Sequence, residues 1–311
     1  MPILDKTFLR IEDDIKSIKI QGAESIAREA VRAFLSAENE AFTTLQRYSD
    51  YVKRLEQIRD RLFATRPTEP ALRNAIGYLF NDVRAKNYSS MHLLHDSIIS
   101  KEKFVTEHFE SVITKLPAIG SAKIKSGMHI YTHCHSSAVV SIILDALVSG
   151  KKITVHNTET RPLMQGRKTA EELARHGIKV IHYPDSAARI AIKQCDLVLL
   201  GADAIDSDLK VYNKIGSELV SVVAKEYGIP VYVCTDSWKF DPRTSNVWHE
   251  NIEERSPKEI WADAPKGITI KNYAFEKIDP KLITGIICEF GIYKLEDFVH
   301  EVHERYKELF E

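Results

Sequence analysis

The first part of the chain shows apolar residues at steps of three and four positions, a spacing that predicts amphipathic helices. The spacing runs through Ile11, Ile15 and Ile18 and resumes after a break at Gln21-Gly22-Ala23. Later stretches that share it cover residues 27–34, 38–63, 70–86 and 90–116. Runs of β-branched residues are few in this part. We therefore expect an all-helical N-terminal domain over residues 1–120.

After Gly120 the pattern changes to short apolar runs that alternate with amphipathic segments. The expected strands cover residues 128–132, 152–156, 179–183, 197–201, 230–234 and 284–288. The expected helices between the first five strands cover residues 137–148, 169–176, 187–193 and 215–227. This alternation predicts parallel βαβ units, and so an α/β, Rossmann-like, doubly wound sheet over residues 121–311. Ligands bind such sheets at the carboxyl ends of the strands.

The charge balance limits the partners that we expect. The 43 basic and 44 acidic side chains give a formal net charge of −1, which argues against nucleic-acid binding because that needs a basic excess. No apolar run approaches the roughly 18 residues of a membrane span, and the first residues lack the apolar core of a signal peptide. The four cysteines are scattered without zinc-finger spacing. These features predict a cytoplasmic protein with free thiols and no membrane partner.

The first expected strand leads into Thr132-His133-Cys134-His135-Ser136-Ser137, just before a helix. A helix N-terminus favours the thiolate, and the two serines suit helix capping beside amides that can hold a phosphate. Cys134 is therefore either chemically active or a small buried thiol next to capping serines. His133 and His135 also suggest a zinc site, but no third and fourth ligands stand at typical spacing, so we expect no metal.

Polar residues also follow the other strands, while no dinucleotide-binding or P-loop motif is present. Asp203 comes just after a buried apolar strand, where burial raises a carboxyl pKa toward the general-acid range; turn capping is its alternative role. Asn213 and Lys214 stand at an expected helix start, and Lys239 follows the fifth strand. The polar loop at residues 159–162 can either position a ligand or tie loops together through an Arg–Glu pair, and the structural role is slightly favoured. Together these residues predict a small anionic substrate that undergoes proton transfer.

Four motifs together resemble one superfamily. They are Thr132-His133-Cys134-His135-Ser136, Glu159-Thr160-Arg161-Pro162 with Gln165-Gly166, Gly201-Ala202-Asp203, and Asn213-Lys214-Ile215-Gly216. The superfamily contains ribose-1,5-bisphosphate isomerase, methylthioribose-1-phosphate isomerase and the alpha, beta and delta regulatory subunits of the translation initiation guanine-nucleotide exchange factor. The resemblance covers nearly the whole chain. The retained Cys134 and Asp203, together with Lys239-Phe240, look most like the first of these families.

That resemblance implies an isomerase that converts α-D-ribose 1,5-bisphosphate to D-ribulose 1,5-bisphosphate in AMP degradation, without cofactor or metal. It implies Cys134 as the proton acceptor and Asp203 as the proton donor. The residues that it implies in substrate binding are Gln21, Gly22, Ala23, Glu24, Arg66, Ser136, Ser137, Ala138, Asn213, Lys214 and Lys239. It also implies a homohexamer built from dimers, with a phosphorylated pentose as the substrate.

The chain departs from the family's pattern at three points. Gln21-Gly22-Ala23-Glu24 replaces the usual Arg-Gly-Ala-Gly and so removes a cation from the first binding loop. Residues 205–210 lack the glycine that usually follows the acid, so this turn must close differently. Ser217 replaces a customary threonine. Two other functions stay open, an isomerase of methylthioribose 1-phosphate and a non-catalytic regulatory subunit. Two chemical routes also stay open, an enolate formed by Cys134 and a direct hydride shift.

Overall fold

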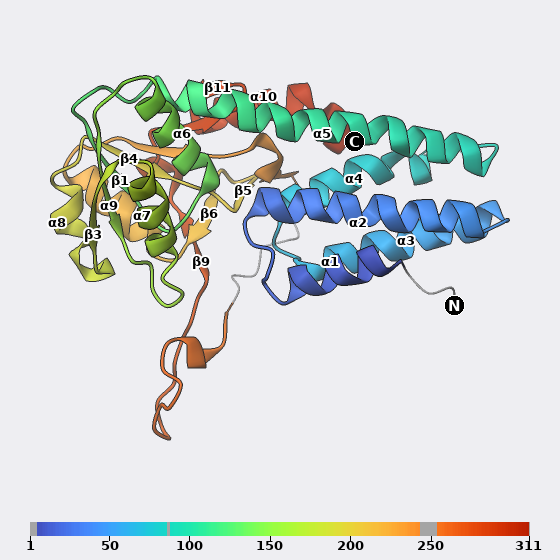
Figure 1. Ribbon diagram of the computed structural model, residues 1–311, viewed down its shortest axis with the longest axis horizontal. Helices are drawn as coiled ribbons and strands as arrows, with labels where there is room; N and C mark the ends of the chain where they lie inside the picture. The colour runs from blue at the N-terminus through green and yellow to red at the C-terminus, as the bar shows by residue number, and fades with distance from the viewer. Residues whose placement is uncertain (1–4, 86–87, 243–253, 311) are drawn as a thin grey trace. The chain divides into compact units, whose positions relative to one another are not determined.

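The computed structural model describes residues 5–85, 88–242 and 254–310, and the chain forms two compact units (Figure 1). The helical unit comprises Met1–Ser111, Trp238–Asp241 and His303–Glu311. The α/β unit comprises Val112–Ser237 and Pro242–Val302. The predicted fold class, a helical N-terminal region followed by a mostly parallel sheet, is confirmed. No helix in the described ranges is long and apolar enough to span a membrane.

The helical unit is built on amphipathic helices whose apolar faces share one core. These helices are α1 (Lys6–Lys16), α2 (Ala23–Thr44), α3 (Tyr48–Thr65), α4 (Pro70–Ala85), the first part of α5 (Met91–Ser121) and α11 (Lys307–Phe310). The Asp5 carboxylate caps α1 by accepting a hydrogen bond from the Phe8 N–H at 3.2 Å. Phe8, Phe34 and Tyr51 are fully buried in the core. The predicted helical periodicity therefore marks the residues that pack together.

Two helix boundaries differ from the sequence-based expectation. The stretch at residues 38–63 contains the end of α2 and most of α3, because Leu45 adopts an extended conformation after Thr44. The Thr43 and Thr44 hydroxyls donate to carbonyls one turn earlier, a competition with the backbone that weakens a helix end. The apolar spacing continues across this break, so periodicity alone does not reveal it. Helix α5 extends past residue 116 and includes Pro117.

The α/β unit contains a seven-stranded sheet in the order β11-β10-β7-β4-β1-β2-β3. Its strands are β1 (His129–Thr132), β2 (Thr154–Thr158), β3 (Lys179–Tyr183), β4 (Leu197–Leu200), β7 (Val231–Cys234), β10 (Gly285–Cys288) and β11 (Gly291–Tyr293). Every neighbouring pair is parallel except β10 with β11. All six predicted strands are present. Their carboxyl ends lie at one edge of the sheet, where a ligand is expected.

The helices of the α/β unit follow the strands as the alternation predicted. They are α6 (Ser137–Val148), α7 (Gln165–Arg175), α8 (Ala188–Ile192), α9 (Ser217–Glu226) and α10 (Leu295–Arg305). Helix α6 matches its predicted bounds, whereas α7 starts four residues earlier than expected. Fully buried residues such as Ile130, Ile142 and Val155 join the central strands to α6 in one apolar core. This core fixes the strand ends that carry the candidate site.

A second, antiparallel group of strands was not predicted. It contains β5 (Ala204–Asp206), β6 (Val211–Lys214) and β9 (Phe275–Ile278), with β6 between the other two. The turn between β5 and β6 closes without glycine, as the sequence required, because Leu209 adopts a φ of +62°. The Asp206 carboxylate accepts the Lys210 N–H at 2.7 Å and the Tyr212 hydroxyl at 3.1 Å. Asp206 is thus a turn residue.

Candidate active site

Cys134 lies directly beyond β1, and hydrogen bonds to neighbouring residues hold its backbone in an unusual conformation. Its φ is +65°, in the left-handed region that non-glycine residues rarely adopt. Its N–H donates to the Thr160 hydroxyl oxygen at 2.9 Å, and its carbonyl accepts from the Thr169 hydroxyl at 2.9 Å. The residue is 8% exposed. Two threonines, Thr160 from the β2–α7 loop and Thr169 from α7, therefore bind both backbone polar groups of Cys134.

Burial raises the pKa of the Cys134 thiol to about 11. The nearby charge of Lys214 is the largest effect that lowers this pKa, and a hydrogen bond from the His135 N–H also lowers it. The negative charges of Asp203 and Asp185 raise the pKa further. Of the two roles left open by the sequence, this conformation favours a buried, protonated thiol, because the loss of hydration outweighs the nearby groups that favour the thiolate.

Both histidines that flank the thiol are engaged with the protein. His133 is buried, with Nε2 at 2.8 Å from the Ile215 carbonyl and Nδ1 at 3.0 Å from the Thr158 hydroxyl. The Nδ1 of His135 lies 3.0 Å from the Thr169 hydroxyl. Burial is the largest cause that lowers the pKa of each histidine. Because both ring nitrogens of His133 already have partners, the residue is not arranged as a metal ligand.

The loop between β2 and α7 supports Cys134 through dense local packing. A Cβ at Gly166 would lie only 1.7 Å from the Thr158 carbonyl oxygen, so glycine is required there. The Asn157 amide donates to the Gly166 carbonyl at 2.6 Å. Glu159 pairs with Arg167 at 3.2 Å, which supports the structural interpretation of this loop. The Arg in that pair is not Arg161, whose backbone N–H instead donates to Asp185 at 2.7 Å.

Asp203 lies between β4 and β5 and is half-buried. Its N–H donates to the Tyr212 carbonyl at 2.9 Å, which fixes its backbone against β6. A Cβ at Gly201 would lie 2.8 Å from the Ser136 Oγ and 4.0 Å from the Asn213 Oδ1. Glycine at this position thus brings the segments that carry Ser136, Asn213 and Asp203 close together.

Lys214 presents a buried positive charge beside these groups. It is 7% exposed, and its Nζ lies 4.8 Å from the centroid of the Phe275 ring, a cation–π contact. Asn213 is also buried, and its amide donates to the Ser217 hydroxyl at 2.9 Å. The sequence predicted that both residues begin a helix. They instead end strand β6, because the unpredicted antiparallel sheet extends to Lys214. Lys214 is placed to attract an anion.

The N-terminus of α9 is already occupied by a carboxylate. Glu276, on the neighbouring strand β9, accepts the Glu218 N–H at 2.7 Å and hydrogen bonds from the Gly216 and Ser217 N–H groups. Burial is the largest influence on Glu276 and raises its pKa. This carboxylate takes the amides that a bound phosphate would need, so the start of α9 is not arranged to hold a phosphate.

The N-terminus of α6 lies beside Cys134. Ser136 is the N-cap, and its hydroxyl accepts the Val139 N–H at 3.4 Å, as the sequence predicted. Ser137 is exposed and Ala138 is half-buried in the first turn. This helix start, unlike that of α9, has no carboxylate cap among the hydrogen bonds of the described residues. It is the better candidate for phosphate binding in the α/β unit.

The other expected binding residues belong to the helical unit. Gly22 has a φ of +89° and precedes α2, while the Gln21 amide donates to the Ile18 carbonyl at 2.9 Å. Glu24 lies 3.7 Å from Arg28. Arg66 follows the last residue of α3, and Lys239 ends the short helical turn Ser237–Lys239. The α/β residues Cys134, Ser136, Asp203, Asn213 and Lys214 form one group, and these helical-unit residues remain expectations.

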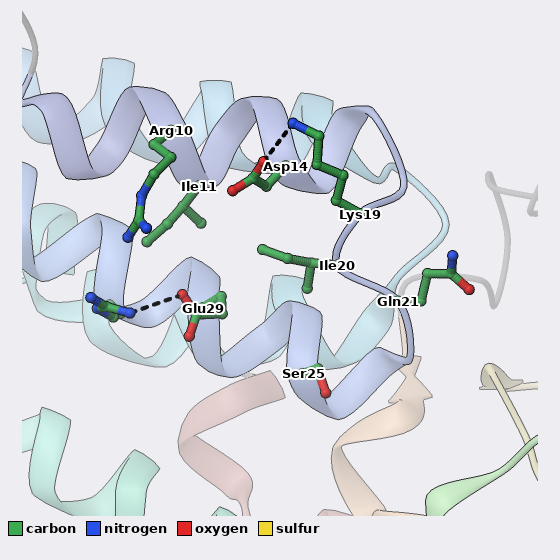
Figure 2. A pocket seen from close by; sticks show the side chains of 9 residues that line it. Arg10, Ile11, Asp14, Lys19, Ile20, Gln21, Ser25 and Glu29 are labelled. Carbon is green, nitrogen blue, oxygen red and sulfur yellow. Dashed lines mark hydrogen bonds and ion pairs between the residues drawn. The ribbon is translucent and has the colours of Figure 1, made fainter.

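A cavity of about 480 Å³ lies in the helical unit next to Gln21 (Figure 2). Its lining combines three cations, two acids and apolar side chains: Arg10, Ile11, Asp14, Lys19, Ile20, Gln21, Ser25, Glu29 and Arg32. Lys19 pairs with Asp14 at 3.0 Å, and Arg32 pairs with Glu29 at 3.4 Å. The charges are therefore largely balanced within the cavity wall.

Comparison with known proteins identifies the family. A model of the Initiation factor 2 subunit family matches residues 19–295. The chain is 37% identical to a ribose 1,5-bisphosphate isomerase of Thermococcus kodakarensis, over 92% of this chain and 91% of that protein. It is 33% identical to a methylthioribose-1-phosphate isomerase of Caldanaerobacter subterraneus, over 92% and 87%.

Solved structures show the same fold. The translation initiation factor eIF-2B structure from Pyrococcus horikoshii aligns with a TM-score of 0.77 at 27% identity, over 94% of this chain and 98% of that one. A 5-methylthioribose 1-phosphate isomerase from the same organism aligns with a TM-score of 0.76 at 22% identity, over 96% and 88%. The chain therefore belongs to the Initiation factor 2 subunit family. Within this family it is an enzyme, an isomerase.

Proposed function

We propose that this isomerase converts α-D-ribose 1,5-bisphosphate to D-ribulose 1,5-bisphosphate. The observation that carries the proposal is the thiol of Cys134 beside the charges of Lys214 and Asp203 at one edge of the parallel sheet. Several relatives at 30–37% identity, covering more than nine-tenths of this chain, bear the name of that activity. A buried cation beside a helix start suits a phosphorylated sugar, and a thiol and a carboxyl group suit hydrogen transfer.

The substrate's chemistry assigns a role to each group. Phosphate at C1 prevents spontaneous opening of the sugar ring, so the ring oxygen must receive a proton while its bond to C1 breaks. Asp203 is the proton donor in this step. Hydrogen must then move from C2 to C1, and the C2 hydroxyl must lose its proton to become the ketone. That proton returns to the Asp203 carboxylate, which restores the acid for the next turnover.

Two routes move the hydrogen, and they differ in what Cys134 does. In the enolate route the Cys134 thiolate removes the C2 proton as the ring opens, and the resulting thiol later delivers a proton to C1. In the hydride route the C2 hydrogen moves to C1 with its electron pair, and the thiol only polarises the site. Because burial holds the pKa of Cys134 at about 11, the protonated thiol favours the hydride route.

Solvent isotope incorporation separates the two routes. Turnover in deuterated water is expected to give ketose without deuterium at C1, because a hydride shift never exposes the moving hydrogen to solvent. The product is analysed by mass spectrometry and proton NMR at low conversion, with purified ketose incubated alongside as the control for later exchange. One deuterium per product molecule at C1 would contradict the hydride route and assign Cys134 as the base.

The substrate itself is tested by comparing sugar phosphates. The value of kcat/KM is expected to be highest for ribose 1,5-bisphosphate and lower by about tenfold or more for ribose 1-phosphate, because each charged hydrogen bond to phosphate contributes about 1.5–3 kcal/mol. Initial rates of ketose formation measure this difference. Absence of turnover with the bisphosphate would overturn the proposal.

Methylthioribose 1-phosphate is the second candidate substrate. It is favoured by one observation, that Gln21 and Glu24 stand where the family's pattern has an arginine and a glycine, and that the Gln21 amide already binds the Ile18 carbonyl. A monophosphate needs fewer cations than a bisphosphate. A kcat/KM for methylthioribose 1-phosphate above that for the bisphosphate would assign this alternative.

We also infer a cytoplasmic enzyme of AMP degradation that assembles as a homohexamer built from dimers. The resemblance in the four motifs supports this inference. A structural relative at 18% identity, an eIF2B-beta2-delta2 complex, is tetrameric, so this fold occurs in assemblies. Mass measurement by light scattering during size-exclusion chromatography tests the number of subunits.

A further inference from the structure

We propose that His133 is a positioning residue that holds Cys134 and Lys214 in register with each other. This inference rests on the proposed function and adds a residue to its machinery. His133 immediately precedes Cys134 at the end of β1. Its ring reaches two other segments of the α/β unit, the end of β2 and the turn that follows Lys214. One imidazole thereby connects three of the segments that build the site.

The hydrogen bonds of His133 define a single proton arrangement. The Ile215 carbonyl can only accept, so the Nε2 atom 2.8 Å away must carry the proton and donate it. In a neutral ring the Nδ1 atom then accepts from the Thr158 hydroxyl at 3.0 Å. The Tyr131 hydroxyl lies 3.3 Å from the Thr158 oxygen and can donate to it in turn. The chain of donors runs in one direction and fixes the orientation of the ring.

The turn after Lys214 is shaped around this ring. A Cβ at Gly216 would lie 2.8 Å from the His133 Nε2 atom, and Gly216 has a φ of +102°, so both contact and conformation call for glycine. Ile215 accepts the ring's hydrogen bond and directly follows Lys214. A shift of the ring would therefore move the turn that carries the buried ammonium group.

His133 acts through its neighbours and does not touch substrate. It is 4% exposed, and both of its ring nitrogens are engaged by the protein. Cys134 and Lys214 interact electrostatically, since the charge of Lys214 is the largest influence that lowers the pKa of the Cys134 thiol. The distance between them is set by the bridge from β1 to the β6–α9 turn. Loss of the bridge should weaken that influence and disorder the catalytic geometry.

The test compares two amide substitutions with different reach. A glutamine amide can reach the position of Nε2 and keep the donor to Ile215, whereas an asparagine amide reaches only the position of Nδ1. His133→Asn is expected to lower kcat by about tenfold or more, because displacement of reacting groups by about 1 Å costs up to a hundredfold. His133→Gln is expected to recover most of that loss.

A second readout needs no substrate. The rate at which iodoacetamide alkylates Cys134 is measured against pH, in a protein whose other three cysteines are serine. In His133→Asn the midpoint of this profile is expected to rise relative to wild type, since Lys214 no longer stabilises the thiolate. A core residue with a merely structural role would lower the melting temperature and leave both the midpoint and kcat of the folded enzyme unchanged. That result would overturn the proposal.

The two readouts separate this proposal from the proposed function. If wild-type protein turns over none of the sugar phosphates, the proposed function fails, while the alkylation profile still decides the role of His133. If His133→Asn does not fold, Thr158→Val replaces it. This substitution removes the Thr158 donor to Nδ1 and leaves the Thr160 hydroxyl, 3.5 Å away, so that the ring no longer keeps the orientation in which it binds Ile215. A shifted profile in Thr158→Val supports the proposal, and an unchanged profile contradicts it.

Discussion

Asp203→Asn is expected to lower kcat on ribose 1,5-bisphosphate by at least about a hundredfold, the usual contribution of a positioned acid or base. Cys134→Ser is expected to lower it by at least about the same factor, because it removes the thiol that polarises the reacting carbons. Asparagine cannot donate a proton to the ring oxygen. Serine matches the size of cysteine but is less polarisable and far less acidic. The losses should appear in kcat, because neither substitution removes a phosphate contact. Initial rates over a range of substrate concentration give kcat and KM separately.

Cys195→Ser provides the matched control for the thiol. Cys195 is buried in the same unit, and its Sγ donates to the Ala191 carbonyl at 3.3 Å, a bond that a serine hydroxyl can also make. Its turnover is expected to equal that of wild type. Thermal denaturation of all variants checks that the fold is intact. A kcat for Cys134→Ser or Asp203→Asn within tenfold of wild type would remove that residue from the mechanism.

Gly166→Ala is expected to destabilise the α/β unit by about 3 kcal/mol or more, at the upper end of overpacking effects, because the clash is with backbone. The added Cβ would lie 1.7 Å from the Thr158 carbonyl oxygen and 2.9 Å from its carbon. The β2–α7 loop must then move, and with it the hydroxyls of Thr158 and Thr160 that bind His133 and Cys134. Turnover should fall together with stability.

Gly77→Ala is the control for the added methyl group. Gly77 lies inside α4, and no heavy atom lies within 4 Å of the position of its Cβ. This substitution should stabilise the helical unit by about 0.5–1 kcal/mol, the usual advantage of alanine over glycine in a helix. Urea denaturation followed by circular dichroism measures both variants. Equal stability of Gly166→Ala and wild type would show that the loop has room to relax.

The sequence predicted the helices and the parallel strands of the fold, but not its short antiparallel strands. Apolar runs between amphipathic segments predict the parallel strands. Strands β5, β6 and β9 are three or four residues long, and β9 is more than 60 residues from its partner β6 along the chain. Nothing local marks such a pairing. Because strand β6 was not predicted, Asn213 and Lys214 were expected at a helix start.

The electrostatics of the site depend on packing more than on local sequence. A helix dipole favours a thiolate at Cys134, and the amides of a helix start favour a bound anion at α9. Burial reverses the first, because the pKa of a dehydrated thiol rises. At the start of α9, the Glu276 carboxylate from strand β9 accepts a helix amide and so takes the place of a bound anion. The supporting hydrogen bonds of Thr158, Thr160 and Thr169 were not predicted, since a threonine gives no sign of its partner in the sequence.

The most direct test of the account is carbon-13 NMR of ribose 1,5-bisphosphate labelled at C2, mixed with a stoichiometric amount of purified protein. The wild-type enzyme is predicted to move the labelled signal from the hydroxyl-bearing carbon region to the ketone region. The Asp203→Asn protein should leave it in place over the same time. An unchanged spectrum with folded wild-type protein would contradict the assignment of this site to the isomerisation of ribose 1,5-bisphosphate.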